Sequence, residues 1–78
     1  MIPIEDVITA IEQVLRMKER SVTTLNAETH LHELGLDSLD LAEVFVRLEL
    51  AVGAELDGSS LRGLSQVGDL TRLHGMHE

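Results

Sequence analysis

Ser38 is the residue of this 78-residue chain whose type and position could best support chemistry. It lies in the run Gly35-Leu36-Asp37-Ser38-Leu39-Asp40, where a long loop meets the start of an amphipathic segment. A phosphate ester on its hydroxyl would meet free backbone N–H groups and the positive end of a helix dipole. The same position is also typical of a serine that only begins a helix.

Two amphipathic helices are expected to position this serine. The apolar side chains of residues 4–18 and of residues 38–52 each repeat along one face of a helix. Asp37 is expected to cap the second helix, with Asp40 three residues on, and Gly53 to follow its end. The apolar face of the first helix comprises Ile4, Val7, Ile8, Ile11, Val14 and Leu15. That of the second comprises Leu41, Val44, Phe45, Leu48 and Val52.

Residues 21–36 show no helical repeat of apolar side chains. A structureless connection of this length is uncommon in a compact domain, so we expect it to be partly ordered. Leu31 and Leu34 are expected to fold back onto the core in a short helical turn. A turn is expected at residues 57–60. Ser65 is expected to cap a last helix over residues 66–74.

Within these connections, Leu61 and Leu64 are expected to dock a short segment after the turn. The last helix would place Val67, Leu70 and His74 on one side. We predict an all-α fold, a three- to four-helix antiparallel bundle in a single domain over residues 1–78.

The second helix has a second apolar stripe, opposite its core face. Leu39, Val46 and Leu50 form it, with Ala42 at its margin. Between the two faces lies a charged ridge made by Asp40, Glu43 and Arg47. Such a stripe is either scattered surface hydrophobicity or a docking site for a partner, and the pattern leaves both open.

The run of residues 34–40, with Asp-Ser-Leu at its centre, resembles the phosphopantetheine attachment motif of acyl carrier proteins. The chain length, the long loop before the serine, the acidity and the run of residues 64–70 agree with that family. The resemblance implies a 4′-phosphopantetheine on Ser38, attached by a separate phosphopantetheinyl transferase. Its thiol would carry acyl or aminoacyl thioesters between acyl-loading and acyl-processing enzymes.

In that family the serine-bearing helix is the main recognition surface. Carried over by position, this implies partner contacts at Asp37, Leu39, Asp40, Ala42, Glu43, Val46 and Arg47. The chain departs from fatty-acid carriers, which are more uniformly acidic here, because Arg47, Leu50 and Ala51 interrupt the acidic run. The resemblance therefore favours a dedicated carrier in a specialised polyketide, nonribosomal peptide or lipid pathway. Asp37 before the serine leans towards acyl rather than peptidyl carriers.

Composition and motifs limit the other functions. With 14 Asp and Glu against 6 Lys and Arg, the net charge of −8 argues against nucleic acid and anionic membranes as partners. No cysteine is present, so a disulfide framework, a thiolate metal site and a cysteine nucleophile are excluded. No carboxylate cluster accompanies the four histidines, so we expect no zinc site. These histidines are His30, His32, His74 and His77. Asp37, Asp40 and Glu43 are not expected to form a calcium-binding loop, because leucines occupy positions at which such a loop needs oxygen ligands.

No histidine is placed to act as a base for Ser38, and Gly-x-Ser-x-Gly is absent, so we expect no enzyme. We expect the chain to be a monomer and to be located in the cytoplasm. Two alternatives remain open. The chain could be an unmodified helical adaptor that binds through Leu39, Val46 and Leu50, or it could be a peptidyl or aminoacyl carrier.

Overall fold

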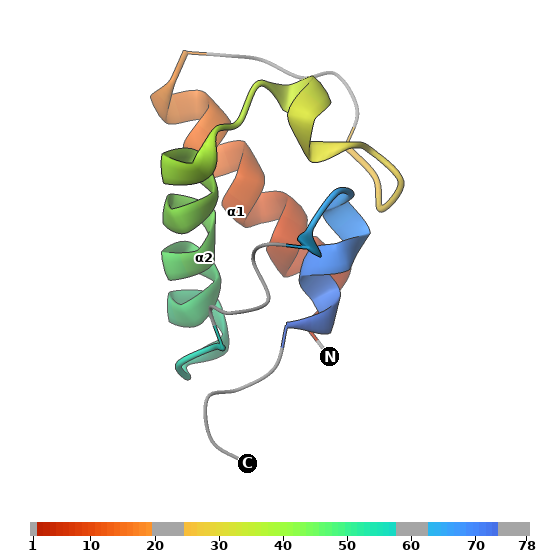
Figure 1. Ribbon diagram of the computed structural model, residues 1–78. Coiled ribbons are helices and arrows are strands. Elements are labelled where there is room, and N and C mark those ends of the chain that lie inside the picture. The colour runs from red at the N-terminus through yellow and green to blue at the C-terminus, as the bar shows by residue number, and fades with distance from the viewer. Residues whose placement is uncertain (1, 20–24, 58–62, 74–78) are drawn as a thin grey trace.

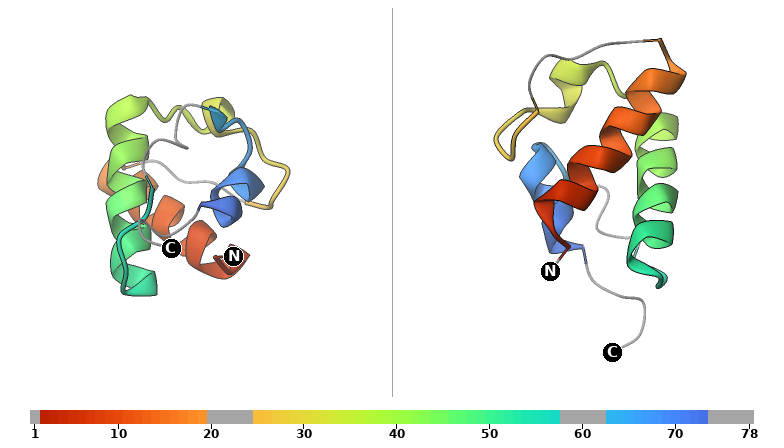
Figure 2. Two further views of the ribbon diagram at one scale, coloured as in Figure 1. Left: turned by 60° about the horizontal axis from the view of Figure 1, so that its bottom comes forward. Right: turned by 180° about the vertical axis from the view of Figure 1, so that it is seen from behind.

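The computed structural model describes residues 2–19, 25–57 and 63–73, and these fold into helices around an aliphatic core (Figure 1). Two α-helices, α1 (Ile4–Met17) and α2 (Ser38–Val52), are joined by a loop that holds the 3-10 helix η1 (Leu31–Leu34). A second 3-10 helix, η3 (Val67–Arg72), packs against α1. Helices α1 and α2 run in opposite directions (Figures 1 and 2). The predicted all-α class is confirmed, and the described residues contain no strand.

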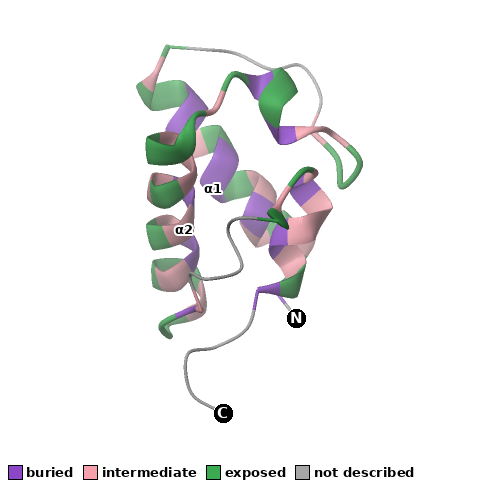
Figure 3. Cartoon of the chain, viewed as in Figure 1, coloured by how far each residue is buried: buried purple, intermediate pink, exposed green. Residues whose placement is uncertain are grey.

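The core lies where α1, α2 and η3 meet, and both predicted apolar faces point into it (Figure 3). Val7, Ile11 and Val14 of α1 are buried, as are Val44 and Leu48 of α2. Three side chains at the margin of the α2 face pack partly buried against this core: Leu41, Phe45 and Val52. The alternation of buried and exposed positions follows the 3.6-residue period, so burial of one face stabilises each helix.

The long connection is ordered where it meets the segment that leads into η3. Leu31 N donates to Ser65 O at 2.8 Å, and Gly68 N donates to Ala27 O at 2.8 Å. An added Cβ at Gly68 would lie 3.0 Å from the Ala27 carbonyl oxygen, so the glycine permits this close approach. Leu31 and Leu34 are buried in η1, which confirms the predicted anchors.

The predicted last helix is confirmed, but it is shorter than the expected residues 66–74 and its predicted cap at Ser65 is wrong. In the structure it is the 3-10 helix η3 with Gln66 at its N-cap. The Asp69 carboxylate accepts hydrogen bonds from the backbone N–H groups of Ser65 and Gln66, so Ser65 donates to this turn rather than capping it. The first amides of η3 also bond outside the helix, Val67 N to Thr29 O at 2.8 Å.

Some of the other predicted core positions are confirmed, and the rest lie outside the described residues. Val67 and Leu70 are buried, and Leu64 packs against the core. Leu61 and His74 lie outside the described residues, as does most of the expected turn at 57–60. In the part of the chain that the structure describes, no helix is both long and apolar enough to cross a bilayer.

Candidate functional site

Ser38 is the first residue of α2, and its side chain is exposed. The predicted cap at Asp37 is confirmed: Asp37 Oδ1 accepts from Asp40 N at 2.9 Å. Asp40 Oδ2 in turn accepts from Asp37 N at 3.1 Å, which completes a reciprocal capping box around the serine. Gly53 ends the helix in the left-handed conformation with φ 73°, as expected. The position of Ser38 is therefore fixed by hydrogen bonds on both sides of it.

The residues before the serine hold this end of α2 at the surface. Leu34 is buried, and Leu36 packs half-buried against the core. Between them Gly35 adopts φ 74°, a left-handed conformation that favours glycine. The two leucines anchor the loop, and the glycine turns it, so that Asp37, Ser38 and Leu39 face solvent.

Lys18 links the end of α1 to the capping box, and sequence reasoning missed this contact. Its Nζ donates to Asp40 Oδ2 and forms an ion pair with it. This hydrogen bond, followed by that from the Asp37 N–H, lowers the pKa of the Asp40 carboxyl below its ordinary value of 3.8. The contact across the bundle depends on how α1 and α2 cross, and no local pattern encodes that crossing.

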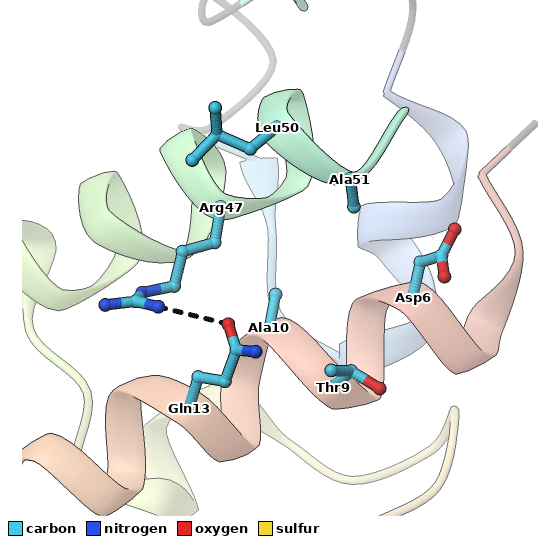
Figure 4. Close-up of a pocket in the computed structure, with 7 residues that line it drawn as sticks. All are labelled: Asp6, Thr9, Ala10, Gln13, Arg47, Leu50 and Ala51. Carbon is cyan, nitrogen blue, oxygen red and sulfur yellow. Dashed lines mark hydrogen bonds between the residues drawn. The ribbon is translucent and has the colours of Figure 1, made fainter. Parts of the chain in front are cut away.

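Arg47 forms a second link between the two helices. Its Nε donates to Glu43 Oε2 at 3.1 Å, and its Nη1 donates to Gln13 Oε1 at 3.1 Å. The remaining terminal nitrogen lies 2.9 Å from the sulfur of Met17. Figure 4 shows the guanidinium pointing toward Gln13 at one end of a groove of about 270 Å³ between α1 and α2. Of the predicted ridge, Asp40 and Arg47 reach Lys18 and Gln13 across the bundle, whereas Glu43 pairs with Arg47 within α2.

The second apolar stripe of α2 faces solvent. Leu39 is 79% exposed, Val46 47% and Leu50 78%, and Ala42 is also exposed. Exposed residues lie along the side of α2 that is turned away from the core (Figure 3). Core packing does not account for them, since the core face of α2 is on the other side of the helix.

The hydroxyl of Ser38 is exposed at the start of α2. Within the described residues no side chain hydrogen-bonds to it, and the Ser38 and Leu39 amides donate to no acceptor there. Unbonded amides at a helix start favour an anionic group. A phosphate ester at this hydroxyl fits the donors present and would extend away from the exposed surface.

The histidines do not form a metal site among the residues described. The rings of His30 and His32 lie 5.6 Å apart between centroids. In residues 2–19, 25–57 and 63–73, no three His, Asp or Glu side chains come together as ligands. His74 and His77 lie outside these ranges.

Comparisons with known proteins agree with this geometry. The family model described as "Phosphopantetheine attachment site" matches residues 5–73, which include Ser38. The solution structure of MacpD, an acyl carrier protein of Pseudomonas fluorescens involved in mupirocin biosynthesis, is similar with a TM-score of 0.75 and 30% identity. The match covers 88% of this chain and 64% of MacpD, so this chain spans less than two thirds of that one. No curated protein is similar enough to count as a match.

Proposed function

Because this chain belongs to the family of phosphopantetheine-bearing acyl carrier proteins, we propose that Ser38 is its attachment residue. The observation that carries the proposal is the exposed hydroxyl of Ser38 at the first position of α2, inside the matched residues. In the loading reaction this hydroxyl loses its proton and forms a phosphate ester. The pyrophosphate bond of coenzyme A breaks: its phosphopantetheine half goes to the serine oxygen, adenosine 3′,5′-bisphosphate leaves, and the serine proton is released.

The chain's own residues hold and present the group. The capping box of Asp37 and Asp40 fixes the start of α2, and the first-turn amides favour the negative charge of a phosphodiester. When bound, phosphopantetheine supplies the thiol that carries the cargo as a thioester, which explains a thiol-based function in a chain without cysteine. Proteins of this family are typically not catalytic, and here the described residues offer Ser38 no hydrogen-bonded base. We assign the catalytic steps to visiting enzymes.

We propose acyl groups of a specialised polyketide pathway as the cargo. The similarity to MacpD supports a polyketide over a fatty-acid pathway, since that protein is involved in mupirocin biosynthesis. Arg47 supports it as well, because its positive charge interrupts the acidic face expected of a general fatty-acid carrier. Carrier proteins interact with phosphopantetheinyl transferases and biosynthetic enzymes, and we expect a transferase and acyl-processing enzymes as partners. We further propose that residues 1–78 act as one monomeric carrier domain in the cytoplasm, the site of coenzyme A supply.

Loading of the serine tests the proposal. We expect incubation with coenzyme A, magnesium and a broad-specificity phosphopantetheinyl transferase to add the mass of one phosphopantetheine. The Ser38→Ala variant is expected to gain nothing. Ser65→Ala is the control, since Ser65 is also exposed but lies outside α2, in the segment before η3, and it is expected to load fully. No gain by the folded parent protein would instead favour an unmodified adaptor.

A further inference from the structure

One carboxylate oxygen joins the start of α2 to the end of α1. Asp40 Oδ2 accepts from the Asp37 N–H within the capping box, and it also accepts from Lys18 Nζ across the bundle. The side chains of Lys18 and Asp40 are 29% and 16% exposed, so water reaches this ion pair only in part. Ser38 lies between the two acidic residues of the box. A change at Lys18 therefore reaches the serine through a single bridging group.

The position of Lys18 is set by the core. Lys18 is the C-cap of α1, and its backbone N–H lies 3.1 Å from Leu15 O and 3.2 Å from Val14 O. The side chains of Val14 and Leu15 are buried. The end of α1 lies beside the start of α2 (Figures 1 and 2). The ion pair thus ties the Asp40 carboxylate to an anchored turn of the neighbouring helix.

Removal of Lys18 would leave the Asp40 carboxylate without a cation among the described residues. A part-buried carboxylate that loses its partner is stabilised by turning towards water, and the Asp37 N–H would then lose its acceptor. The negative charge of Asp40 would also stand uncompensated two residues from Ser38, where it opposes an incoming phosphate. Both effects act on the serine, although an ion pair near the surface adds little to the stability of the whole fold.

We propose that Lys18 is a positioning residue for the loading of Ser38. By holding the Asp40 carboxylate in the capping box, it keeps the Ser38 hydroxyl and the first-turn amides in the arrangement that receives the phosphate. Its ammonium bonds to Asp40 and acts on the serine through that carboxylate. This inference rests on the proposed function, and it names a determinant of the transfer rate at that same site.

Single-turnover loading tests this role, with a broad-specificity phosphopantetheinyl transferase in excess and coenzyme A as the donor. We expect Lys18→Met to lower the transfer rate at saturating transferase about fivefold. The transferase concentration that gives half of the maximal rate should stay within about twofold of the parent value, because Lys18 positions the serine rather than docks the enzyme. Lys18→Arg keeps a cation that can donate to Asp40, and we expect it to restore the transfer rate to within about twofold. A loss that appears only in the concentration dependence would overturn the proposal.

Arg16→Met is the matched control. Arg16 is exposed in the last turn of α1, two residues before Lys18, and it forms no ion pair with the described residues. Its substitution removes the same positive charge from the same end of the helix, so this variant is expected to load like the parent. Equal losses in Arg16→Met and Lys18→Met would assign the effect to the general charge of this end, against the proposal.

A double-mutant cycle tests whether Lys18 acts through Asp40. In the Asp40→Asn background the uncharged amide needs no cation, and its oxygen can still accept from the Asp37 N–H. We therefore expect Lys18→Met to change the transfer rate by less than about twofold in that background. A fivefold loss, about as large as in the parent background, would show that Lys18 acts on another group and would overturn the proposal.

Amide hydrogen exchange, measured by NMR, separates a local effect from a loss of overall stability. We expect Lys18→Met to speed exchange at the Asp37 and Asp40 amides, which make the two hydrogen bonds of the capping box. Exchange at the Leu48 amide reports on the core, since the side chain of Leu48 is fully buried, and it should change less. Equal acceleration at all three amides would mean that Lys18 only stabilises the fold, which contradicts a positioning role.

The loading experiment also distinguishes the two proposals. If the parent loads and Lys18→Met loads at the parent rate, the inference fails while the proposed function stands. If no transferase loads the folded parent, the proposed function fails, and the inference fails with it.

Discussion

At the scale of single residues, the contact between Asp40 and Lys18 makes stability depend on pH. The hydrogen bond from Lys18 and that from the Asp37 amide hold the folded-state pKa of Asp40 below the ordinary 3.8. Ionised Asp40 therefore stabilises the folded state above about pH 4, and this stabilisation is lost as pH falls through the lower folded-state pKa. We predict that the free energy of unfolding, measured by urea titration, decreases across this acidic range and decreases less in Asp40→Asn.

Asp69 keeps the free energy of unfolding dependent on pH even when Asp40 is replaced. The backbone N–H groups of Gln66 and Ser65 lower its pKa as well, so its contribution to acid sensitivity remains in Asp40→Asn. Lys18→Met should reproduce part of the Asp40→Asn effect, since it removes one of the two main donors to Asp40. An identical pH slope in Asp40→Asn and the parent would contradict the assigned role of this carboxylate.

At the scale of the element, α2 has two apolar faces that should respond differently to truncation. Leu48 is fully buried, whereas Leu50 is 78% exposed two residues on. We predict that Leu48→Ala lowers the free energy of unfolding by about 2–5 kcal/mol because it leaves a cavity. Leu50→Ala should change it by less than about 0.5 kcal/mol. Chemical denaturation of this matched pair checks both values, and equal losses would contradict the assignment of the faces.

The same element shows what sequence could and could not predict. The faces of α2, its cap at Asp37 and its end at Gly53 follow from local periodicity and backbone chemistry, and all three were predicted. The contacts of Asp40 with Lys18 and of Arg47 with Gln13 were not, because they depend on how two helices cross. The 3-10 form of η3 was not predicted, because its first amides donate to carbonyls of the 27–29 loop. Helix propensity along the sequence does not report such contacts.

At the scale of the whole molecule, closure of the fold depends on the close approach of Gly68 to the 25–29 loop. A Cβ at Gly68 would lie 3.1 Å from the Ala27 Cβ and closer still to its carbonyl oxygen. That carbonyl accepts the Gly68 N–H, so it cannot move away without weakening the bond. We predict that Gly68→Ala costs about 1–3 kcal/mol in the free energy of unfolding. Gly63→Ala is the control, because nothing lies within 4 Å of a Cβ there.

The central claim concerns one oxygen atom, the Ser38 hydroxyl at the start of α2. The measurement that tests it most directly is fragmentation mass spectrometry of the chain after loading with coenzyme A and transferase. We predict that the added phosphopantetheine lies on the peptide that contains Ser38 and on no other. Attachment to a different serine, or a folded protein that acquires no phosphopantetheine, would contradict the claim.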